Sequence, residues 1–289
     1  MCDVIDIENS KTIQQIGLGG FGKIYLCEDN KGKQFVSKQI SNLDSFLTEV
    51  QIYSGLREET DYFPRFYNYF NGEVKKCIFM ENCQQDLRSM LDKGEEICHD
   101  SFILHISKGL QILKNKQIIH CDLKPDNILY DERTDLFKIC DFGIPCFNSK
   151  KRGFPVQTVY YRAPEVIARK DYDQSVDIWS FGCIIHEMIY GRILFQYKEE
   201  IECFFWMIVN LGLPPKDFYQ IVYEKSIRYE GKEPIFYNVK NDEEYYIDIS
   251  KMSLPRETSS LVIKRCLQWI PADRITPSEI IDLYEDVCF

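Results

Sequence analysis

Residues 118–129 read IIHCDLKPDNIL and place a histidine, two aspartates, a lysine and an asparagine within a run of aliphatic residues. A hydrophobic core does not need these polar groups, because each of them costs free energy when it is buried without a partner. Asp122 could accept a proton, Lys124 could neutralise negative charge, and Asn127 could hold a metal ion. The aliphatic neighbours would anchor the loop and keep these side chains in place. The segment therefore indicates a catalytic loop.

Composition excludes several classes of protein. The chain has 289 residues, of which 45% are hydrophobic and 14% aromatic, and this is typical of an ordered globular protein with room for two lobes. Its formal net charge of −10 argues against nucleic-acid binding, which would need a basic surface. The N-terminus MCDVIDIENS does not resemble a signal peptide, and the apolar run CFFWMIVNLGL is far shorter than a bilayer span. We therefore expect an intracellular protein, cytoplasmic or nuclear, that is not secreted, has no transmembrane segment and binds neither nucleic acid nor membrane.

The cysteines do not indicate a metal site. Twelve cysteines are scattered along the chain, with no Cys-x-x-Cys pair and no cluster of cysteine and histidine. In a reducing compartment they are most simply interpreted as small buried hydrophobic residues with free thiols.

Hydrophobic periodicity divides the chain into two parts. About the first eighty residues are predicted to form strands, with one helix at residues 43–56. From about Leu87 onward helices dominate, and they are expected at residues 101–115, 175–191, 261–270 and 276–284. The helix at 175–191 is apolar almost all round and should be buried and end at Gly191, whereas the last helix should open with a capping box of Thr276 and Glu279.

A strand-rich part followed by a helix-rich part predicts an α+β fold with two lobes. We expect an N-lobe of about residues 1–80, a hinge at residues 81–85 and a C-lobe at residues 86–289. No internal repeat or low-complexity linker is visible. The chain is expected to carry no accessory domain beside these two lobes.

Residues 17–22, GLGGFG, join two predicted strands. Glycines allow backbone N–H groups to approach phosphate oxygens, although an ordinary hairpin turn would show the same pattern. The motif lacks the Gly-Lys-Ser/Thr ending of a Walker loop and is not followed by a helix, so neither a Walker loop nor a Rossmann fingerprint fits. Lys38 on the next strand could orient two phosphates if Glu49 held its side chain. Taken alone, these two residues would be interpreted as an exposed strand lysine and a solvated helix glutamate.

Asp141, in the sequence CDFG, could supply a second metal ligand beside Asn127. Magnesium prefers a few oxygen ligands together with phosphate oxygens. Phosphoryl transfer depends mostly on positioning and charge neutralisation, and it needs cations, metal ligands and one base. The chain supplies this set.

Taken in order, the motifs resemble those of eukaryotic protein kinase domains over nearly the whole chain. They are GLGGFGKI at 17–24, FVSK at 35–38, Glu49, HCDLKPDN at 120–127, DFG at 141–143, APE at 163–165, DIWSFGC at 177–183 and Arg274. TVYYRAPE at 158–165 and LGLPP at 211–215 are similar to sequences of the CMGC group. Cysteine at position 121 in place of arginine, and RCLQWIPADRITPSE at 265–279, resemble the dual-specificity tyrosine-regulated kinase (DYRK) family.

The resemblance implies a bilobal protein kinase fold and an ATP-dependent protein serine/threonine kinase, with tyrosine autophosphorylation as in dual-specificity enzymes left open. The implied cofactors are ATP and two Mg²⁺ ions during turnover, and the implied partners are protein substrates of a monomeric enzyme. Asp122 would be the base and Lys124 would contact the γ-phosphate, with Lys38 paired to Glu49 and Thr158 bridging the base and Lys124. Asn127 and Asp141 would be the metal ligands.

The resemblance also implies two further groups of residues. The nucleotide would be bound by Gly17, Leu18, Gly19, Gly20, Phe21, Gly22, Ile24, Val36, Lys38, Met80, Glu81, Cys83, Asp86 and Leu129. The structural and substrate-pocket residues would be His120, Phe142, Tyr161, Arg162, Glu165, Asp177 and Arg274, with Tyr53 beside His120 and Phe142 in a regulatory spine. Glu165 would pair with Arg274, and Asp177 would accept N–H bonds from the catalytic loop.

Several positions depart from the family pattern. Pro155 stands at the position of the activating tyrosine and Val159 replaces an arginine that would bind its phosphate, so we expect activity without phosphotyrosine. Val36 replaces the usual alanine beneath adenine. Asp126 replaces the usual glutamate, which predicts a weaker preference for a basic residue upstream of the target hydroxyl, with Asp86 helping.

Two alternatives remain. A pseudokinase, which is a binding module with a kinase fold, should have lost Lys38, Asp122, Asn127 or Asp141, and all four residues are present. A small-molecule kinase would not need the segment TVYYRAPE, which builds a surface for a peptide.

Overall fold

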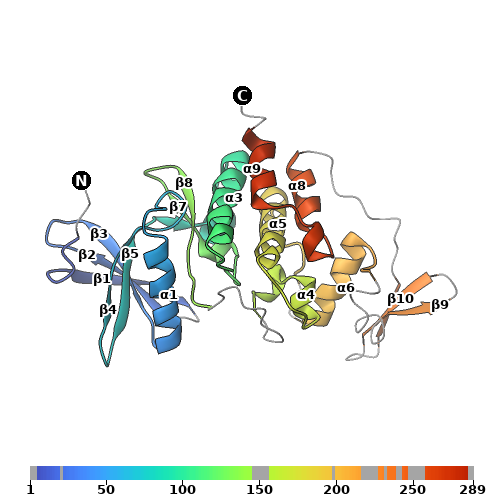
Figure 1. Ribbon diagram of the computed structural model, residues 1–289, viewed down its shortest axis with the longest axis horizontal. Helices are drawn as coiled ribbons and strands as arrows, with labels where there is room; N and C mark the ends of the chain where they lie inside the picture. Colours follow the sequence, from blue (N-terminus) through green and yellow to red (C-terminus); the bar gives the residue numbers. More distant parts are fainter. Residues whose placement is uncertain are drawn as a thin grey trace. The chain divides into compact units, whose positions relative to one another are not determined.

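The computed structural model describes residues 5–19, 22–144, 156–196, 199–215, 227–230, 233–238, 243–246 and 258–285. The chain divides into two compact units (Figure 1). Unit 1 comprises Met1–Glu96 and Pro125–Pro145, and unit 2 comprises Ile97–Lys124 and Cys146–Phe289. Unit 1 extends beyond the predicted hinge at residues 81–85, because the returning segment pairs with residues that follow this hinge.

Unit 1 contains a five-stranded antiparallel sheet in the order β1-β2-β3-β5-β4. Its strands are β1 Lys11–Gly19, β2 Gly22–Glu28, β3 Gln34–Gln39, β4 Phe66–Asn71 and β5 Lys76–Glu81. The strands β1 and β2 form the hairpin that carries the glycine-rich motif. The strand-rich first part predicted from the sequence is confirmed.

Helix α1, Leu43–Gly55, is the one helix that was predicted in the strand-rich part. It begins after Asn42, whose side-chain oxygen accepts the N–H of Ser45 at 2.9 Å and so caps the helix. The helix packs against β4 and β5. Its buried residues are Phe46, Glu49, Ile52 and Tyr53, which recur at the spacing of one helix face. A glutamate and a tyrosine therefore point inward on an otherwise apolar face.

A second, three-stranded sheet completes unit 1. It has the order β6-β7-β8, with β6 Gln85–Asp86, β7 Ile128–Asp131 and β8 Leu136–Ile139. Helix α2, Leu87–Lys93, follows β6, and the short 3-10 helix η1, Pro125–Asn127, precedes β7. This sheet places Asn127 and the DFG segment at residues 141–143 at the ends of neighbouring strands.

Unit 2 is helical, as predicted for the second part of the chain. Its helices are α3 His99–Asn115, α4 Pro164–Ile167, α5 Ser175–Tyr190, α6 Glu200–Leu211, α8 Thr258–Cys266 and α9 Pro277–Glu285, with short 3-10 helices η2 Val159–Tyr161 and η4 Pro271–Asp273. Helix α5 packs between α3 and α8, and α9 lies against α3 (Figure 1). Among the described residues, no helix is both long and apolar enough to span a membrane.

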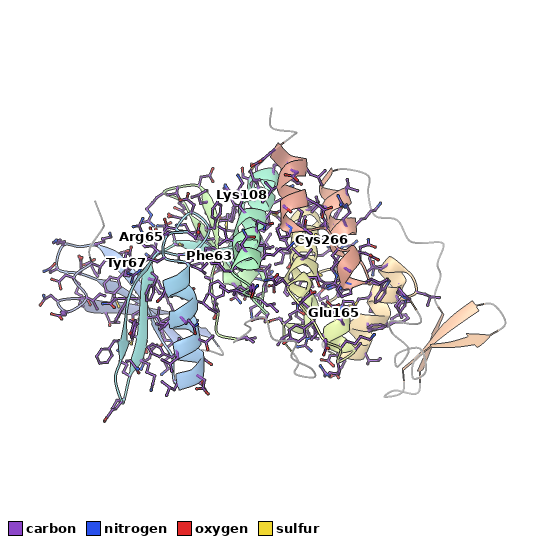
Figure 2. The ribbon with its side chains drawn as sticks, viewed as in Figure 1. Phe63, Arg65, Tyr67, Lys108, Glu165 and Cys266 are labelled. Carbon is purple, nitrogen blue, oxygen red and sulfur yellow. The ribbon has the colours of Figure 1, made fainter. Side chains whose placement is uncertain are left out.

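Helix α5 is the centre of unit 2, and its prediction as a buried helix is confirmed. It ends at Gly191, which has the left-handed backbone conformation with φ +65°. Gly182 allows α8 to approach closely, because a Cβ at this position would lie 2.6 Å from the Cβ of Cys266. Cys266 lies on α8 and is labelled in Figure 2. The DIWSFGC motif therefore supplies both a buried helix and a close helix–helix contact.

The C-terminal region of unit 2 contains one predicted feature and one that was missed. The capping box of α9 is confirmed, because the N–H of Thr276 donates to Glu279 at 2.8 Å and the N–H of Glu279 donates to the Thr276 hydroxyl at 3.3 Å. A small antiparallel sheet was not predicted. Its strands are β9 Ile227–Glu230, β10 Glu233–Asn238 and β11 Glu243–Tyr246. Strands of four to six residues are too short to give a clear alternating pattern.

Candidate active site

Unit 1 contains a cavity of about 490 Å³ next to the glycine-rich hairpin, within the range of small-molecule sites. The predicted nucleotide-binding residues in its lining are Gly17, Ile24, Val36, Lys38, Met80, Glu81, Cys83, Asp86 and Leu129. Both predicted metal ligands, Asn127 and Asp141, also line it. Residues from five stretches of sequence therefore meet in one cavity of unit 1, because two sheets and one returning segment contribute to its walls.

Other residues of the glycine-rich motif lie elsewhere. Leu18 and Gly22 are in β1 and β2 but outside this lining, and Leu18 is 74% exposed. Gly19 is the last residue of β1. Side chains alternate along a strand, so Leu18 faces away when Gly17 faces the cavity. A Cβ at Gly22 would lie 2.1 Å from the carbonyl oxygen of Gln39, which explains the glycine sterically. Gly20 and Phe21 lie outside the described residues.

The ammonium group of Lys38 joins two carboxylates at the back of the cavity. Its Nζ donates to Oε1 of Glu49 at 2.6 Å and to Oδ1 of Asp141 at 2.7 Å. Lys38 is 4% exposed and Glu49 is fully buried. Burial would lower the pKa of Lys38, but the Glu49 and Asp141 carboxylates outweigh it and raise this pKa above its ordinary value. The lysine is therefore a fixed cation at the wall of the cavity, and the expected pair with Glu49 is present.

Asn127 and Asp141 lie close together because their backbones are bonded. The N–H of Cys140 donates to the carbonyl of Asn127 at 3.0 Å. The Asp141 side chain is 26% exposed and lines the cavity, while its Oδ1 is oriented by Lys38. An amide oxygen and a carboxylate beside a fixed cation fit a magnesium ion that also binds phosphate oxygens.

The predicted hinge is held by a group of four charged side chains. The Glu81 carboxylate accepts from Lys138 at 2.7 Å and from Arg133 at 3.0 Å, and Asp131 pairs with Arg133 at 2.8 Å. The Glu81 side chain therefore contacts β8 and the turn between β7 and β8. Burial raises the pKa of Cys83, two residues further on, to about 12, so its thiol is protonated at neutral pH.

Asp86 has a structural role in addition to lining the cavity. Its carboxylate caps α2 by accepting the N–H of Ser89 at 2.7 Å and the Ser89 hydroxyl at 3.0 Å. Sequence reasoning missed other lining residues, among them Ile16, Leu26, Pro64 and Cys140. Alternation along β1 and β2 could have identified the first two.

In unit 2, Asp122, Lys124 and Thr158 form one hydrogen-bonded cluster. Oδ1 of Asp122 accepts from the N–H of Thr158 at 2.9 Å and from its hydroxyl at 2.8 Å. The Lys124 ammonium lies 3.0 Å from Oδ2 of Asp122 and donates to the Thr158 hydroxyl at 3.2 Å. Thr158 thus bridges the carboxylate and the ammonium, as expected from the sequence.

The loop that carries Asp122 is hydrogen-bonded to Asp177 on α5. The Asp177 carboxylate accepts the N–H of His120 at 2.7 Å and that of Cys121 at 3.0 Å. Burial raises the pKa of the Asp177 carboxyl, and the hydrogen bonds that it accepts from the amides of His120 and Cys121 oppose this rise. The ring nitrogen Nδ1 of His120 in turn accepts the N–H of Asp122 at 3.2 Å. The aspartate on an apolar helix is therefore explained by its bonds to the loop.

The interpretation of the cysteines as small buried residues with free thiols is wrong at several positions. Cys98 is exposed, and Cys83 and Cys140 are only partly buried. Cys121 is disulfide-bonded, whereas the other cysteines in the described part of the chain have free thiols. Sequence spacing cannot reveal such a pair, because pairing depends on Cα positions in the folded chain.

Glu165 and Arg274 form a buried pair with two bonds, each of 2.6 Å. Both side chains have no exposed surface. The guanidinium group also donates to the carbonyls of Ser175 and Gln268 and lies 5.1 Å from the centre of the Trp179 ring. The predicted pair is present, and it joins the APE motif to the loop before α9.

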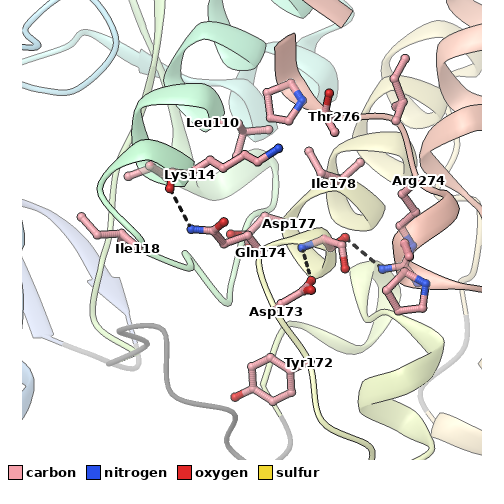
Figure 3. Close-up of a pocket in the computed structure, with 16 residues that line it drawn as sticks. Leu110, Lys114, Ile118, Tyr172, Asp173, Gln174, Asp177, Ile178, Arg274 and Thr276 are labelled. Carbon is pink, nitrogen blue, oxygen red and sulfur yellow. Dashed lines mark hydrogen bonds between the residues drawn. The ribbon is translucent and has the colours of Figure 1, made fainter. Parts of the chain in front are cut away.

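A second cavity, of about 460 Å³, lies in unit 2 next to this pair (Figure 3). It is lined by α3, by residues 172–178 and by the loop that leads into α9. In Figure 3 the side chain of Gln174 donates to the Lys114 carbonyl, and the N–H of Ser175 donates to Asp173. None of the predicted nucleotide or metal residues lines it.

The segment before α4 is fixed by Arg162. The guanidinium group donates to the carbonyls of Val156 at 2.8 Å and Gln157 at 2.6 Å, and it pairs with Glu200 at the start of α6. Arg169 donates to the other oxygen of Glu200 at 2.8 Å. Sequence reasoning did not identify Glu200, because an acidic residue in a first helical turn has an ordinary explanation in the helix dipole.

Tyr161 is anchored in the core of unit 2. Its hydroxyl donates to Glu187 on α5 at 2.6 Å. The side chain of Gln157 donates to the carbonyl of Val176 and to Ser180, and it accepts the N–H of Ala163. The predicted substrate-pocket residues Tyr161 and Arg162 are thus held by bonds that the motif did not show. Pro155, which stands at the tyrosine position, lies outside the described residues.

The family model for the protein kinase domain matches residues 10–283. Human dual specificity tyrosine-phosphorylation-regulated kinase 4 is 32% identical over 292 residues, which cover 94% of this chain and 56% of that protein. Dual specificity tyrosine-phosphorylation-regulated kinase 2 of Drosophila melanogaster is 30% identical over 302 residues, covering 92% of this chain and 40% of the relative. Mitogen-activated protein kinase HOG1 of Cryphonectria parasitica is 30% identical over 290 residues, covering 93% of this chain and 76% of that protein.

The chain thus spans about half the length of the first of these relatives and less of the second. The resemblance that the sequence motifs indicated, to protein kinases and within them to the DYRK family, is confirmed.

Proposed function

Because this chain belongs to the protein kinase family, we propose that it transfers the γ-phosphate of ATP to serine and threonine hydroxyls of proteins. The observation that carries the proposal is the cavity of unit 1, in which one buried ammonium group joins Glu49 to Asp141. A cation fixed between a helix carboxylate and a predicted metal ligand is suited to orienting a nucleotide triphosphate.

Each group of the cavity has a role in this proposal. Lys38 contacts the α- and β-phosphates, and Glu49 keeps its flexible side chain in one position. The backbone at Glu81 and Cys83 meets adenine, with Val36 and Leu129 on the two faces of the ring. Gly17 and its neighbours in the hairpin approach the phosphates, since glycine leaves the backbone N–H groups accessible.

Asn127 and Asp141 would hold magnesium, with two ions expected during turnover. When bound, magnesium neutralises charge on the phosphate oxygens. Lys38 fixes the orientation of the Asp141 carboxylate, so this ligand is held in place before any nucleotide binds. The donor set of an amide and a carboxylate oxygen suits this ion.

Asp122 is the base that accepts the proton of the substrate hydroxyl. Its carboxylate is already oriented by two bonds from Thr158. Lys124 neutralises charge on the transferred phosphoryl group, and its position is fixed through the same threonine. Holding both groups through one residue keeps the base and the cation at a constant separation.

The alternative of a kinase-like binding module has no feature in its favour, because Lys38, Asp122, Asn127 and Asp141 are all present. The division into an N-lobe at about 1–80, a hinge at 81–85 and a C-lobe at 86–289 belongs to the same proposal. So does a monomeric enzyme of the cytoplasm or nucleus that binds neither nucleic acid nor membrane. Tyrosine autophosphorylation would make it a dual-specificity kinase, like the relatives that carry this name.

The substrate side of the proposal rests on two acidic residues and one segment. Asp126 lines the cavity of unit 1, as does Asp86, and we propose that they favour a basic residue upstream of the target hydroxyl. The carboxylate of Asp86 is partly committed to capping α2, which is consistent with a weak preference. Tyr161 and Arg162 shape the pocket for the residue that follows the target.

The test is release of ADP from ATP and Mg²⁺ with degenerate serine/threonine peptides as acceptors. Replacement of Asp122 by alanine should lower kcat by about 100-fold or more, because a positioned base contributes this much. Tyr172→Phe serves as the control, because the Tyr172 hydroxyl has no hydrogen-bond partner among the described residues. Equal phosphate transfer by the Asp122→Ala variant and the parent protein would show that the activity belongs to a contaminant.

A further inference from the structure

Tyr53 lies on α1 one helical turn after Glu49 and is 1% exposed. Its ring packs edge-on against Phe142 of the DFG segment, with 5.3 Å between centroids and an interplanar angle of 81°. It is stacked on Phe66 of β4 at 6.3 Å, and Phe63 contacts the Phe142 ring at 6.1 Å. The tyrosine ring is therefore fixed within an aromatic cluster of unit 1.

The hydroxyl of Tyr53 has a more specific contact than the ring. It accepts a hydrogen bond from the backbone N–H of Asp141 at 3.2 Å. Asp141 has a left-handed backbone with φ +68°, a conformation that residues other than glycine rarely adopt. Its side chain is bonded to Lys38 and its Oδ1 also accepts the N–H of Gly143 at 3.3 Å. Asp141 is thus held at both its backbone and its carboxylate.

The restraint on the Asp141 carboxylate and the restraint on its amide both originate from one face of α1. Glu49 and Tyr53 are four residues apart, so their side chains project from the same face. Glu49 acts through Lys38 on the Asp141 carboxylate, whereas Tyr53 acts directly on the Asp141 amide. Helix α1 therefore controls the direction of this carboxylate through two independent contacts.

We propose that Tyr53 is a positioning residue for Asp141, whose hydroxyl holds the strained backbone so that the carboxylate faces the nucleotide cavity. The proposal rests on the proposed function for its catalytic consequence, but the contact itself does not. An apolar side chain could fill the same space in the aromatic cluster, but it would leave the Asp141 amide without this acceptor. Burying a tyrosine hydroxyl is costly unless it is bonded, so the cluster alone does not explain the residue.

Hydrogen exchange at the Asp141 amide tests the contact without any substrate. In the Tyr53→Phe variant the ring remains and the acceptor is lost, so this amide should exchange about threefold to tenfold faster. The Tyr172→Phe variant is the matched control, because Tyr172 is buried in unit 2 and its hydroxyl has no partner among the described residues. Its Asp141 amide should exchange at the parent rate. Equal exchange in Tyr53→Phe and the parent protein would overturn the proposal.

Steady-state kinetics then separates positioning from packing. Tyr53→Phe should lower kcat about threefold to tenfold while the KM for ATP changes by less than about twofold, because the nucleotide contacts are intact. A rise in KM with unchanged kcat would overturn the positioning role. If the parent protein transfers no phosphate but Tyr53→Phe still accelerates exchange, the proposed function fails and the contact between Tyr53 and Asp141 is supported.

Discussion

Replacement of Glu165 by glutamine tests an ion pair of unit 2 whose two side chains are fully buried. The substitution keeps the shape of the side chain and removes its charge, so the Arg274 guanidinium loses its counter-ion in a site with no solvent exposure. Two charge-assisted bonds of 2.6 Å are weakened at once. Leaving one partner of a buried pair uncompensated costs about 3–5 kcal/mol.

Bonds from Arg274 to the carbonyls of Ser175 and Gln268 do not offset this cost, because they are already made in the parent protein. A loss of about 3–5 kcal/mol is a large fraction of the stability of an ordinary domain, which is about 5–15 kcal/mol. The expected result is therefore a much lower midpoint of unfolding in urea with a similar slope.

A matched control is available in the same unit. Glu285→Gln removes the charge of a pair with Lys108 whose two side chains are 31% and 50% exposed. Exposed pairs of this kind contribute below about 1 kcal/mol, so this variant should unfold close to the parent midpoint. A loss of less than about 1 kcal/mol in Glu165→Gln, equal to that of Glu285→Gln, would refute the argument that the Glu165 pair is closed to solvent.

Three further predictions concern the substrate segment, the phosphorylation state and pH. In Glu200→Gln the partly buried contacts to Arg162 and Arg169 lose their counter-charge, so the KM for a peptide substrate should rise about threefold to tenfold with the KM for ATP unchanged. The parent protein should be active with no phosphotyrosine detected by mass spectrometry. Stoichiometric phosphate on the activation segment that is required for activity would contradict this prediction. Burial lowers the pKa of His186 to about 4, although its bond to the backbone of Arg192 opposes the shift. Between the ordinary pKa of histidine and this lowered pKa, the unfolded chain binds more protons than the folded chain, so the free energy of unfolding should fall by about 3 kcal/mol as pH drops through this range. His186→Gln should flatten the pH dependence, and a curve parallel to that of the parent protein would contradict the assignment.

Residues whose chemistry requires a partner were predictable from sequence. Lys38 needed a carboxylate, and Glu49 was identified on the nearby predicted helix for that reason. Asp177 on an apolar helix likewise needed N–H donors, and the catalytic loop supplies them. In each case an unsatisfied buried charge would be costly, so a partner was required. For Lys38 this requirement pointed to Glu49, whereas for Asp177 the resemblance to protein kinases implied the catalytic loop as the partner.

Residues with an ordinary local explanation could not be identified in this way. Glu200 fits the first turn of any helix. Tyr53 was expected beside Phe142 from the resemblance to kinases, but an aromatic contact accounts for its ring and does not indicate the bond of its hydroxyl. Their specific contacts depend on groups far away in sequence, because Glu200 pairs with the Arg162 side chain 38 residues away and Tyr53 accepts from the Asp141 backbone N–H 88 residues away. Short strands such as those of the β9–β11 sheet were missed because four to six residues give little periodic signal.

Backbone strain is a further feature that sequence did not indicate. Cys121, Asp141 and Gln157 all have left-handed backbones, with φ values of +65°, +68° and +67°. None of them is glycine, and a left-handed conformation at such residues is uncommon. Cys121 precedes the proposed base Asp122, and Gln157 precedes Thr158, which orients that base. Strain is thus found next to the groups that the proposed chemistry uses.

In each of the three residues the strained backbone is held through its own N–H group. The amide of Cys121 donates to Asp177 at 3.0 Å, that of Asp141 donates to Tyr53 at 3.2 Å, and that of Gln157 donates to the Cys121 carbonyl at 2.8 Å. Strain of about 1–3 kcal/mol per residue persists only where the surroundings oppose relaxation, and a bond to the amide does so directly. The acceptors come from helices α1 and α5 and from the catalytic loop itself. Helices α1 and α5 therefore do more than fill a core, because buried side chains of each fix a backbone turn next to a side chain that the proposed chemistry uses.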